Sequence, residues 1–137
     1  MRVLALDYGL ARTGLAISDL SGVLATPLFA LPSYNTDRLI DGICDVIKEK
    51  SVTKIIMGMP SRTDGQISEM QGKVRDFAAQ LTEKSGMEIE FIDEKFTTVI
   101  ASQKLHQNNI NAKKQKGLID AAAASVMLQD WLDSHRR

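Results

Sequence analysis

The chain opens with Met1-Arg2-Val3-Leu4-Ala5-Leu6-Asp7-Tyr8-Gly9, and this stretch decides the fold. An uninterrupted apolar run of this length is typical of a β-strand that is covered on both faces. The run ends in Asp7, and an unpaired carboxylate is very costly to bury. We therefore expect a cation, a metal or water beside Asp7. The alternative is that Asp7-Tyr8-Gly9 forms only a turn, because Asp favours the first position of turns.

Two further strands are expected close behind the first one. The first strand covers residues 2–7, the second covers 13–18, and the third covers 23–31 with Pro27 inside it. The short gaps between them predict an antiparallel meander. Proline cannot donate a hydrogen bond to a neighbouring strand, so the third strand should lie at an edge of the sheet or carry a bulge.

The pattern then alternates between helices and strands. Helices are expected at 36–50, from 67 to about 85, from 97 or 98 to 105, and at 118–134, with strands at 54–60 and 88–92 and a polar, basic segment at 108–117. A meander followed by alternating helices and strands predicts an α/β protein with a five-stranded mixed sheet flanked by helices. The sheet would combine the three-stranded antiparallel meander with two parallel strands, in one domain spanning residues 1–137.

Composition limits the classes of function only weakly. The 137 residues include 17 Lys and Arg against 17 Asp and Glu, so the formal net charge is zero. This removes the simplest argument for nucleic-acid binding, although a local basic patch would suffice for it. The single Cys44 cannot form an internal disulfide and is expected to be a small core residue. With neither a signal peptide nor a membrane-length apolar run, we expect a cytoplasmic protein without a membrane partner.

Two other acidic residues are expected to join Asp7. Glu94 follows the last strand, and parallel strand ends meet at one edge of a sheet. Asp120 falls at the start of the last expected helix, on the same stripe as Ala123, Ala124, Met127 and Trp131. Alternatively, Glu94 is a solvated loop residue and Asp120 only complements the helix dipole in the first turn.

Three converging carboxylates repel one another unless a cation neutralises them. Oxygen ligands without His or Cys suit Mg²⁺ or Mn²⁺. A site of this kind can hold two ions, one activating water and one stabilising the leaving oxygen of a phosphodiester. The acids together therefore predict metal-dependent hydrolysis of phosphodiester bonds.

Four sequence blocks resemble the YqgF family, also called RuvX, of proteins with an RNase H-like fold. They are Leu6-Asp7-Tyr8-Gly9 with Arg12, Gly14, Ala16 and Ser18-Asp19; Ile56-Met57-Gly58-Met59-Pro60 with Asp64-Gly65; Asp93-Glu94-Lys95-Phe96-Thr97-Thr98 with Ala101; and Lys116, Ile119-Asp120, Ala122-Ala123 with Leu128-Gln129. The resemblance implies that Asp7, Glu94 and Asp120 are the metal-binding, catalytic acids of a nuclease. The family usually has Arg where this chain has Lys95.

Residues around the acids are candidates for nucleic-acid binding. Glycines allow a phosphate backbone to approach closely, and basic side chains bind phosphates. The candidates are Gly9, Arg12, Gly58, Arg62, Lys95, Lys113, Lys114 and Lys116. The alternatives are that Gly14 and Gly65 serve only tight turns, and that the basic run before the last helix is a solvated loop.

The resemblance implies two substrates, the 5′ end of pre-16S ribosomal RNA and the four-way DNA (Holliday) junction. Junction cleavage needs two symmetric cuts and hence a dimer, whereas RNA trimming does not, so a monomer and a homodimer both stay open. A non-catalytic nucleic-acid-binding factor in ribosome assembly is an alternative of another class. A lobe of a sugar kinase or actin-like ATPase is a third, disfavoured because those proteins need two lobes.

Overall fold

The computed structural model describes residues 1–60, 65–93 and 112–135, and within these the side chains of 65–68 and 112–117 are not described. In chain order the elements are β1 (Val3–Tyr8), β2 (Arg12–Ser18), β3 (Ala25–Pro32), α1 (Thr36–Glu49), β4 (Lys54–Met59), α2 (Gly65–Ser85), β5 (Ile89–Asp93) and α4 (Ala112–His135). The helix expected near residues 97–105 lies outside the described residues.

The strands form one mixed sheet in the order β3-β2-β1-β4-β5. Strands β1, β2 and β3 are antiparallel neighbours, whereas β4 is parallel to β1 and β5 is parallel to β4. This arrangement confirms the expected meander joined to two parallel strands. The carboxyl ends of β1, β4 and β5 consequently lie at the same edge of the sheet.

The third strand occupies an edge of the sheet, as its proline predicted. Within the described residues, strand β3 pairs only with β2. The register between them shifts at Leu15 and Ala16, next to the partner Pro27. The missing N–H of the proline is tolerated because this strand lies at the edge and the ladder is irregular there. Both expectations for this strand are therefore confirmed.

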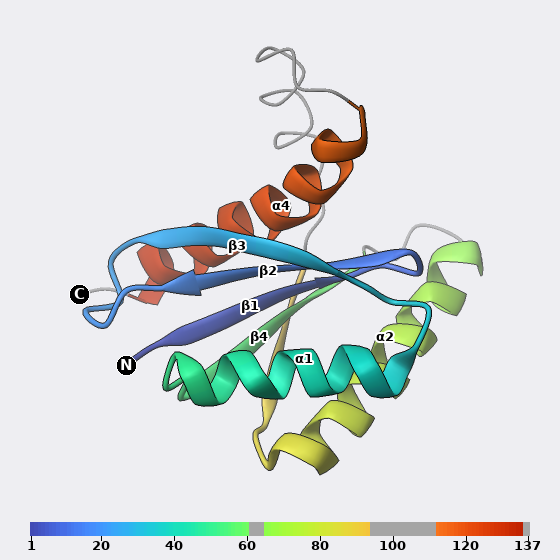
Figure 1. Cartoon of the computed structure of the whole chain (residues 1–137), viewed down its shortest axis with the longest axis horizontal. Coiled ribbons are helices and arrows are strands. Elements are labelled where there is room, and N and C mark those ends of the chain that lie inside the picture. The colour runs from blue at the N-terminus through green and yellow to red at the C-terminus, as the bar shows by residue number, and fades with distance from the viewer. Residues whose placement is uncertain (61–64, 94–111, 136–137) are drawn as a thin grey trace.

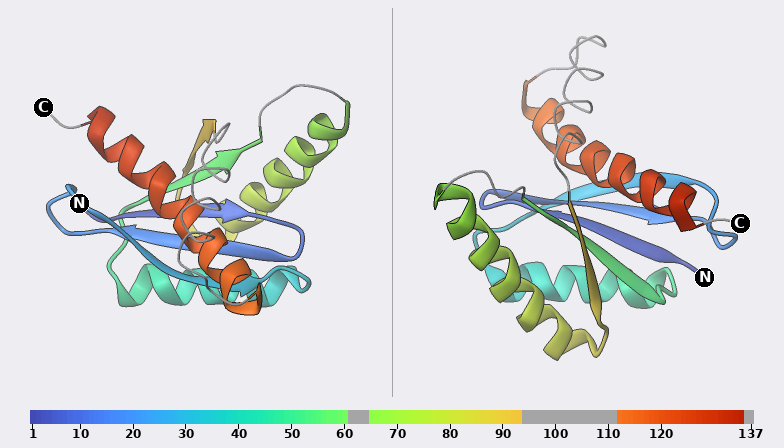
Figure 2. Two further views of the ribbon diagram at one scale, coloured as in Figure 1. Left: turned by 90° about the horizontal axis from the view of Figure 1, so that it is seen from above. Right: turned by 180° about the vertical axis from the view of Figure 1, so that it is seen from behind.

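Helices cover the two faces of the sheet unequally. Figures 1 and 2 show α1 and α2 on one face and α4 crossing the other. Strand β1 serves both layers by strict alternation: Leu4 and Leu6 face α1 and α2, whereas Val3 and Ala5 face α4. All four side chains are fully buried, as expected for an apolar strand between two helical layers.

The helix ends on the α1–α2 face follow local sequence signals. The Asn35 side chain accepts a hydrogen bond from the backbone N–H of Arg38 at 3.1 Å and caps α1. Helix α2 ends at Ser85, and the following Gly86 has φ +74°. A left-handed residue at this position is typical of helix C-termini and favours glycine.

The last helix starts six residues earlier than the sequence pattern predicted. It begins at Ala112 and not at residue 118, so residues 112–117 of the basic segment are helical where a loop was expected. That expectation was wrong because it relied on an apolar stripe, which the segment Ala112-Lys113-Lys114-Gln115-Lys116 lacks. These residues are nevertheless strong helix formers, and in Figure 1 the first turns of α4 project beyond the sheet.

Side chains of α4 anchor its carboxyl-terminal half. Gln129 accepts from the backbone N–H of Ala25 and donates to the carbonyl of Val23, both at 2.9 Å. Trp131 is buried, as expected of a core residue, and its indole N–H donates to Glu90 at 2.8 Å. The helix is therefore fixed to β3 on one side and to β5 on the other.

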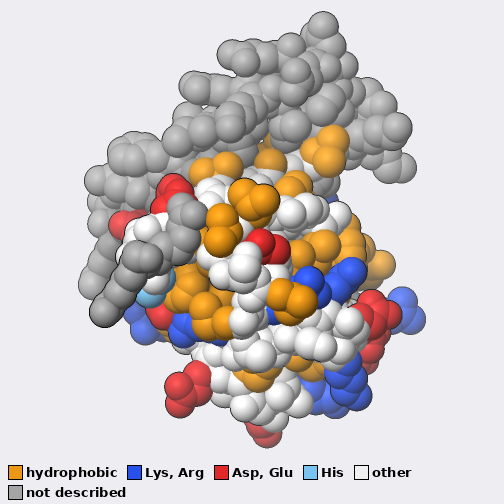
Figure 3. Space-filling model, turned by 90° about the vertical axis from the view of Figure 1, so that its left-hand side faces the viewer, with side chains coloured by type: hydrophobic (Ala, Val, Ile, Leu, Met, Phe, Trp, Pro, Cys, Tyr) orange, Lys and Arg blue, Asp and Glu red, His pale blue; other side chains and the backbone are white. Residues whose placement is uncertain are grey.

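Figure 3 shows the end of the molecule at which the N-terminus and the β2–β3 turn lie, and charged and hydrophobic side chains are mixed there. The exposed hydrophobic residues at the N-terminus and in the β2–β3 turn are Met1, Leu20, Val23 and Leu24. Within the described part of the chain, no helix is both long enough and apolar enough to cross a membrane.

Candidate metal and nucleic-acid site

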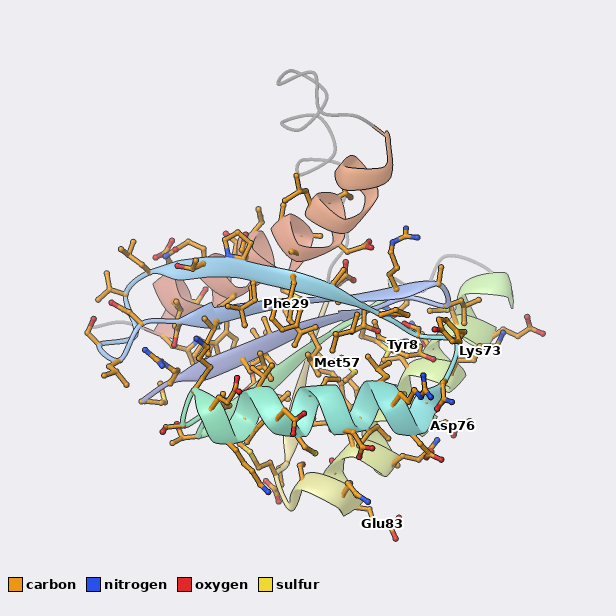
Figure 4. The ribbon with its side chains drawn as sticks, viewed as in Figure 1. Tyr8, Phe29, Met57, Lys73, Asp76 and Glu83 are labelled. Carbon is orange, nitrogen blue, oxygen red and sulfur yellow. The ribbon has the colours of Figure 1, made fainter. Side chains whose placement is uncertain are left out.

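Asp7 points into the α4 layer. Side chains alternate along a strand, and Val3 and Ala5 of the same strand belong to the core under α4. The next residue, Tyr8, faces the other layer and stacks on Phe77 of α2, with ring centroids 4.6 Å apart. Figure 4 shows Tyr8 at the α2 end of the sheet. Asp7 therefore lies on the α4 face, at the edge where the parallel strands end.

Glycines flank Asp7 on both neighbouring strands. Gly14 of β2 is its direct partner in the antiparallel ladder. On the other side Leu6 pairs with Met57 of β4, which places the next residue, Gly58, beside Asp7. Ile56 faces α4, so Gly58 lies on that face as well. The Asp7 carboxylate is thus bordered by two positions that have no side chains.

Asp120 reaches this place because α4 lies directly on Gly14. A Cβ at position 14 would overlap the backbone oxygen and carbon of Asp120. Directly paired residues of an antiparallel ladder have Cα atoms about 5 Å apart, so the contact brings the Asp120 backbone close to Asp7. Gly14 lies within β2 and serves helix packing, which excludes the alternative that it serves only a tight turn.

The carboxylate of Asp120 forms an ion pair with Arg12. The guanidinium Nε donates to Oδ2 at 2.7 Å, and the two side chains are 38% and 21% exposed. Burial raises the pKa of the Asp120 carboxyl above its ordinary value, while the hydrogen bond and charge of Arg12 act in the opposite direction. Arg12 is thus the neighbouring cation that favours the ionised form of Asp120.

The position of Asp120 in its helix excludes one alternative. Asp120 lies more than two turns inside α4, which begins at Ala112. The helix dipole acts within the terminal turn, so Asp120 does not serve as the expected first-turn acid. Ala123, Ala124 and Met127 on the same stripe are buried, and Asp120 lies at the point where this stripe meets the edge of the sheet.

The donor chemistry of the site fits a hard divalent cation. Asp7 and Asp120 supply carboxylate oxygens, which Mg²⁺ and Mn²⁺ prefer. Among the residues that the structure describes, no group of three or more His, Cys, Asp or Glu could hold a metal ion. The predicted third acid, Glu94, lies outside those residues, directly after β5 ends at Asp93.

The remaining predicted contacts are distributed as follows. Arg62 and Lys95 lie outside the described residues, and Lys113, Lys114 and Lys116 lie in the first turns of α4, with undescribed side chains. The prediction of a basic loop before the helix is therefore corrected to a basic helical segment. Gly9 has a structural role, since a Cβ there would lie 2.6 Å from the carbonyl oxygen of Arg12.

Comparison with known proteins identifies the family. The family model described as "RuvX: Holliday junction resolvase" matches residues 1–134. The chain belongs to the RuvX family. Its curated relatives include proteins of Bacteroides fragilis, 33% identical over 98% of both chains, and of Thiobacillus denitrificans, 36% identical over 96% of this chain and 91% of the relative. Both are named as pre-16S rRNA nucleases.

Solved structures agree on the fold of this RuvX chain. RuvC of T. thermophilus in complex with a Holliday junction substrate has a TM-score of 0.61 at 11% identity and covers 98% of this chain and 94% of that one. The Fowlpox virus resolvase in complex with Holliday junction DNA has a TM-score of 0.60 at 15% identity, with both chains fully covered. These similarities confirm the RNase H-like fold.

Two features of this RuvX site were not predicted from the sequence. The pairing of Arg12 with Asp120 joins residues 108 positions apart, and no local pattern indicates it. Gly14 belongs to the first of the four sequence blocks, but its contact with α4 follows only from the packing of the helix.

Proposed function

We propose that this protein is a metal-dependent endonuclease that trims the 5′ end of pre-16S ribosomal RNA in the cytoplasm. The observation that carries the proposal is the approach of Asp120 to Asp7 across Gly14, at the carboxyl edge of the parallel strands. Ligands of such sheets bind at this edge. The choice of substrate is supported by membership of the RuvX family and by relatives that are named as pre-16S rRNA nucleases.

Asp7 and Asp120, together with Glu94, would hold the divalent metal, Mg²⁺ or Mn²⁺, with room for two ions in the proposal. The bound metal would supply an activated water and stabilise the leaving oxygen of the phosphodiester. The protein contributes rigidity: Asp7 is fixed by its strand, and Asp120 by the contact of its backbone with Gly14. Backbones held in this way keep Asp7 and Asp120 close together before a cation binds.

The surroundings of the acids suit a phosphate backbone. Gly58 leaves the α4 face on the β4 side of Asp7 without a side chain, so a phosphate can approach from that side. The Gly14 side is covered by the backbone of Asp120. We assign Gly9, Arg12 and Gly58, with Arg62 and Lys95, to substrate contacts at this edge. Lys113, Lys114 and Lys116 would extend the contact along the first turns of α4.

Two other functions are tested by the same experiment. The family description names a Holliday junction resolvase, so a four-way DNA junction is the second candidate substrate, and its symmetric cleavage would require a homodimer. The third candidate is a nucleic-acid-binding assembly factor that does not cleave, favoured by Lys95 at a position where Arg is usual. Binding by such a factor would survive removal of the acids.

The deciding experiment compares cleavage of a pre-16S rRNA fragment and a four-way junction side by side, with Mg²⁺, with Mn²⁺ and with chelator. Wild type should cleave the RNA at a defined site in either metal. Asp7→Asn should reduce cleavage by at least about 100-fold, because loss of a residue that only supports a metal ligand already costs up to about 100-fold. The thermal stability of this variant should equal that of wild type. The control Asp37→Asn changes an exposed acid in the first turn of α1 and should be fully active.

Absence of cleavage of both substrates in both metals would refute the nuclease proposal. Cleavage of the junction alone would favour the resolvase. Salt-dependent binding that persists in the triple variant Asp7→Asn, Glu94→Gln, Asp120→Asn, without cleavage by wild type, would favour the assembly factor.

A further inference from the structure

Arg12 already binds one oxygen of the carboxylate that the proposed metal needs. Its Nε donates to Oδ2 of Asp120 at 2.7 Å. A guanidinium and a divalent cation that share one partly buried carboxylate repel each other, and the repulsion is stronger away from bulk water. Metal and Arg12 should therefore compete for Asp120.

The backbones on both sides of this ion pair are fixed, so an exchange of partners would involve only side chains. Arg12 begins β2 and is paired with Pro32 of β3. The residue before it, Ala11, accepts a hydrogen bond from the backbone N–H of Ser33 at 3.0 Å. The hydroxyls of Thr13 and Ser33 are 2.8 Å apart and buried. On the other side, the Asp120 backbone rests on Gly14.

The Arg12 side chain nevertheless has access to solvent. It is 38% exposed, compared with 21% for Asp120. The long side chain can therefore leave the carboxylate and remain at the same edge of the sheet. A guanidinium is well suited to phosphate oxygens, because its planar fork donates two parallel hydrogen bonds.

We propose that Arg12 is an internal counter-ion that a divalent metal displaces from Asp120, and that the released guanidinium then binds a phosphate of the nucleic acid. The proposal rests on the proposed function, because it assumes that Asp120 binds the metal. It adds an order of events, in which metal loading makes Arg12 available to the substrate. The opposing possibility is that Arg12 stays on Asp120 and orients it as a metal ligand.

A measurement on the wild-type protein distinguishes displacement of Arg12 from an Arg12 that stays on Asp120. The Arg12 Nε–H resonance is followed by ¹⁵N–¹H NMR during titration with Mg²⁺ alone, without nucleic acid. An Nε–H that donates to a carboxylate is shifted and exchanges slowly with water, so displacement should move the resonance toward the position of a free arginine side chain and speed its exchange. An unchanged resonance at saturating Mg²⁺ would overturn the proposal.

Substitution supplies a second readout. Arg12→Gln should bind Mn²⁺ about 2- to 5-fold more tightly in calorimetry, the factor that corresponds to removing a partly exposed ion pair. Arg12→Lys keeps the charge without the fork and should lie between Arg12→Gln and wild type. The matched control is Arg75→Gln, which removes one positive charge from α2, where the guanidinium lies 6.0 Å from the Phe91 ring. It should leave Mn²⁺ affinity unchanged.

Removing Arg12 should strengthen metal binding but weaken the binding of nucleic acid to the metal-loaded protein. With chelator, Arg12→Gln and wild type should bind a pre-16S rRNA fragment equally well, because Arg12 is held by Asp120. With Ca²⁺ in place of Mg²⁺, to slow cleavage, Arg12→Gln should bind it more weakly than wild type. Weaker Mn²⁺ binding by Arg12→Gln would show that Arg12 orients Asp120, and would overturn the proposal.

The outcomes separate this inference from the proposed function. If wild type binds neither Mg²⁺ nor Mn²⁺, both are refuted. If wild type binds metal and cleaves, while Arg12→Gln binds Mn²⁺ no more tightly than wild type, only the displacement of Arg12 is refuted.

Discussion

Gly14 of β2 lies directly beneath the backbone of Asp120 in α4, so closely that position 14 has no space for a Cβ. The same glycine is the ladder partner of Asp7. One residue without a side chain therefore determines how close the two acids come. The geometry of the candidate site depends on this helix–strand contact as much as on the acids themselves.

Gly14→Ala should destabilise the protein and separate the acids. The new methyl group meets backbone atoms of Asp120, which cannot move aside by changing rotamer. The cost should be about 3 kcal/mol, at the upper end of values for overpacking, measured by urea denaturation. In the folded fraction, Mn²⁺ affinity should fall as well, because α4 must move away from the sheet.

The matched control for this substitution is Gly72→Ala in α2. A Cβ at Gly72 would meet nothing within 4 Å, and alanine is the better helix former. This variant should gain about 0.5–1 kcal/mol and keep its metal affinity. Equal stability of Gly14→Ala and wild type would contradict the contact described above.

Asp19 should make the β2–β3 turn sensitive to acid. Its carboxylate accepts from the Ser21 hydroxyl at 2.6 Å and from the backbone N–H groups of Val23 and Leu24 at 2.8 and 3.2 Å. These bonds, that from Ser21 foremost, lower the pKa of Asp19 from 3.8 to about 2. A lowered carboxyl pKa stabilises the fold above the unfolded-state value, and this contribution is lost as the pH falls from about 4 to about 2.

Asp19→Ala should therefore be less stable than wild type at pH 7 and should lose less stability between pH 4 and pH 2. Thermal denaturation across this pH range provides the measurement. Ser21→Ala, which removes the largest cause of the shift, should give an intermediate pH dependence. Parallel pH profiles for Asp19→Ala and wild type would show that the turn does not contribute.

The basic start of α4 should contribute to nucleic-acid binding through charge alone. Changing Lys113, Lys114 and Lys116 together to Gln should weaken binding and reduce the slope of log K against log salt concentration by about 0.7–0.9 for each phosphate that the variant no longer neutralises. The control Lys48→Gln, Lys50→Gln alters lysines at the end of α1 and should leave the slope unchanged. An unchanged slope in the triple variant would remove this segment from the interface.

Much of the fold follows from local sequence signals. The alternation of β1, the edge position of β3 and the caps Asn35 and Gly86 depend on short-range geometry, which a single sequence displays. The start of α4 at Ala112 was missed because its first residues carry no apolar stripe. An amphipathic pattern indicates which face of a helix is buried against the sheet. The part of a helix that extends beyond the sheet has no buried face and therefore no such pattern.

By itself the sequence determined the order of the strands and helices, the chemistry of the acids and the strand end at which Asp7 lies. Only the tertiary structure decided that Gly14 supports Asp120 and that Arg12 pairs with it across 108 residues. The physical reason is that strand and helix periodicity are encoded locally, whereas the distance between a strand and the helix crossing it depends on the packing of side chains from both. At Gly14 the distance between strand and helix is short because this residue has no side chain.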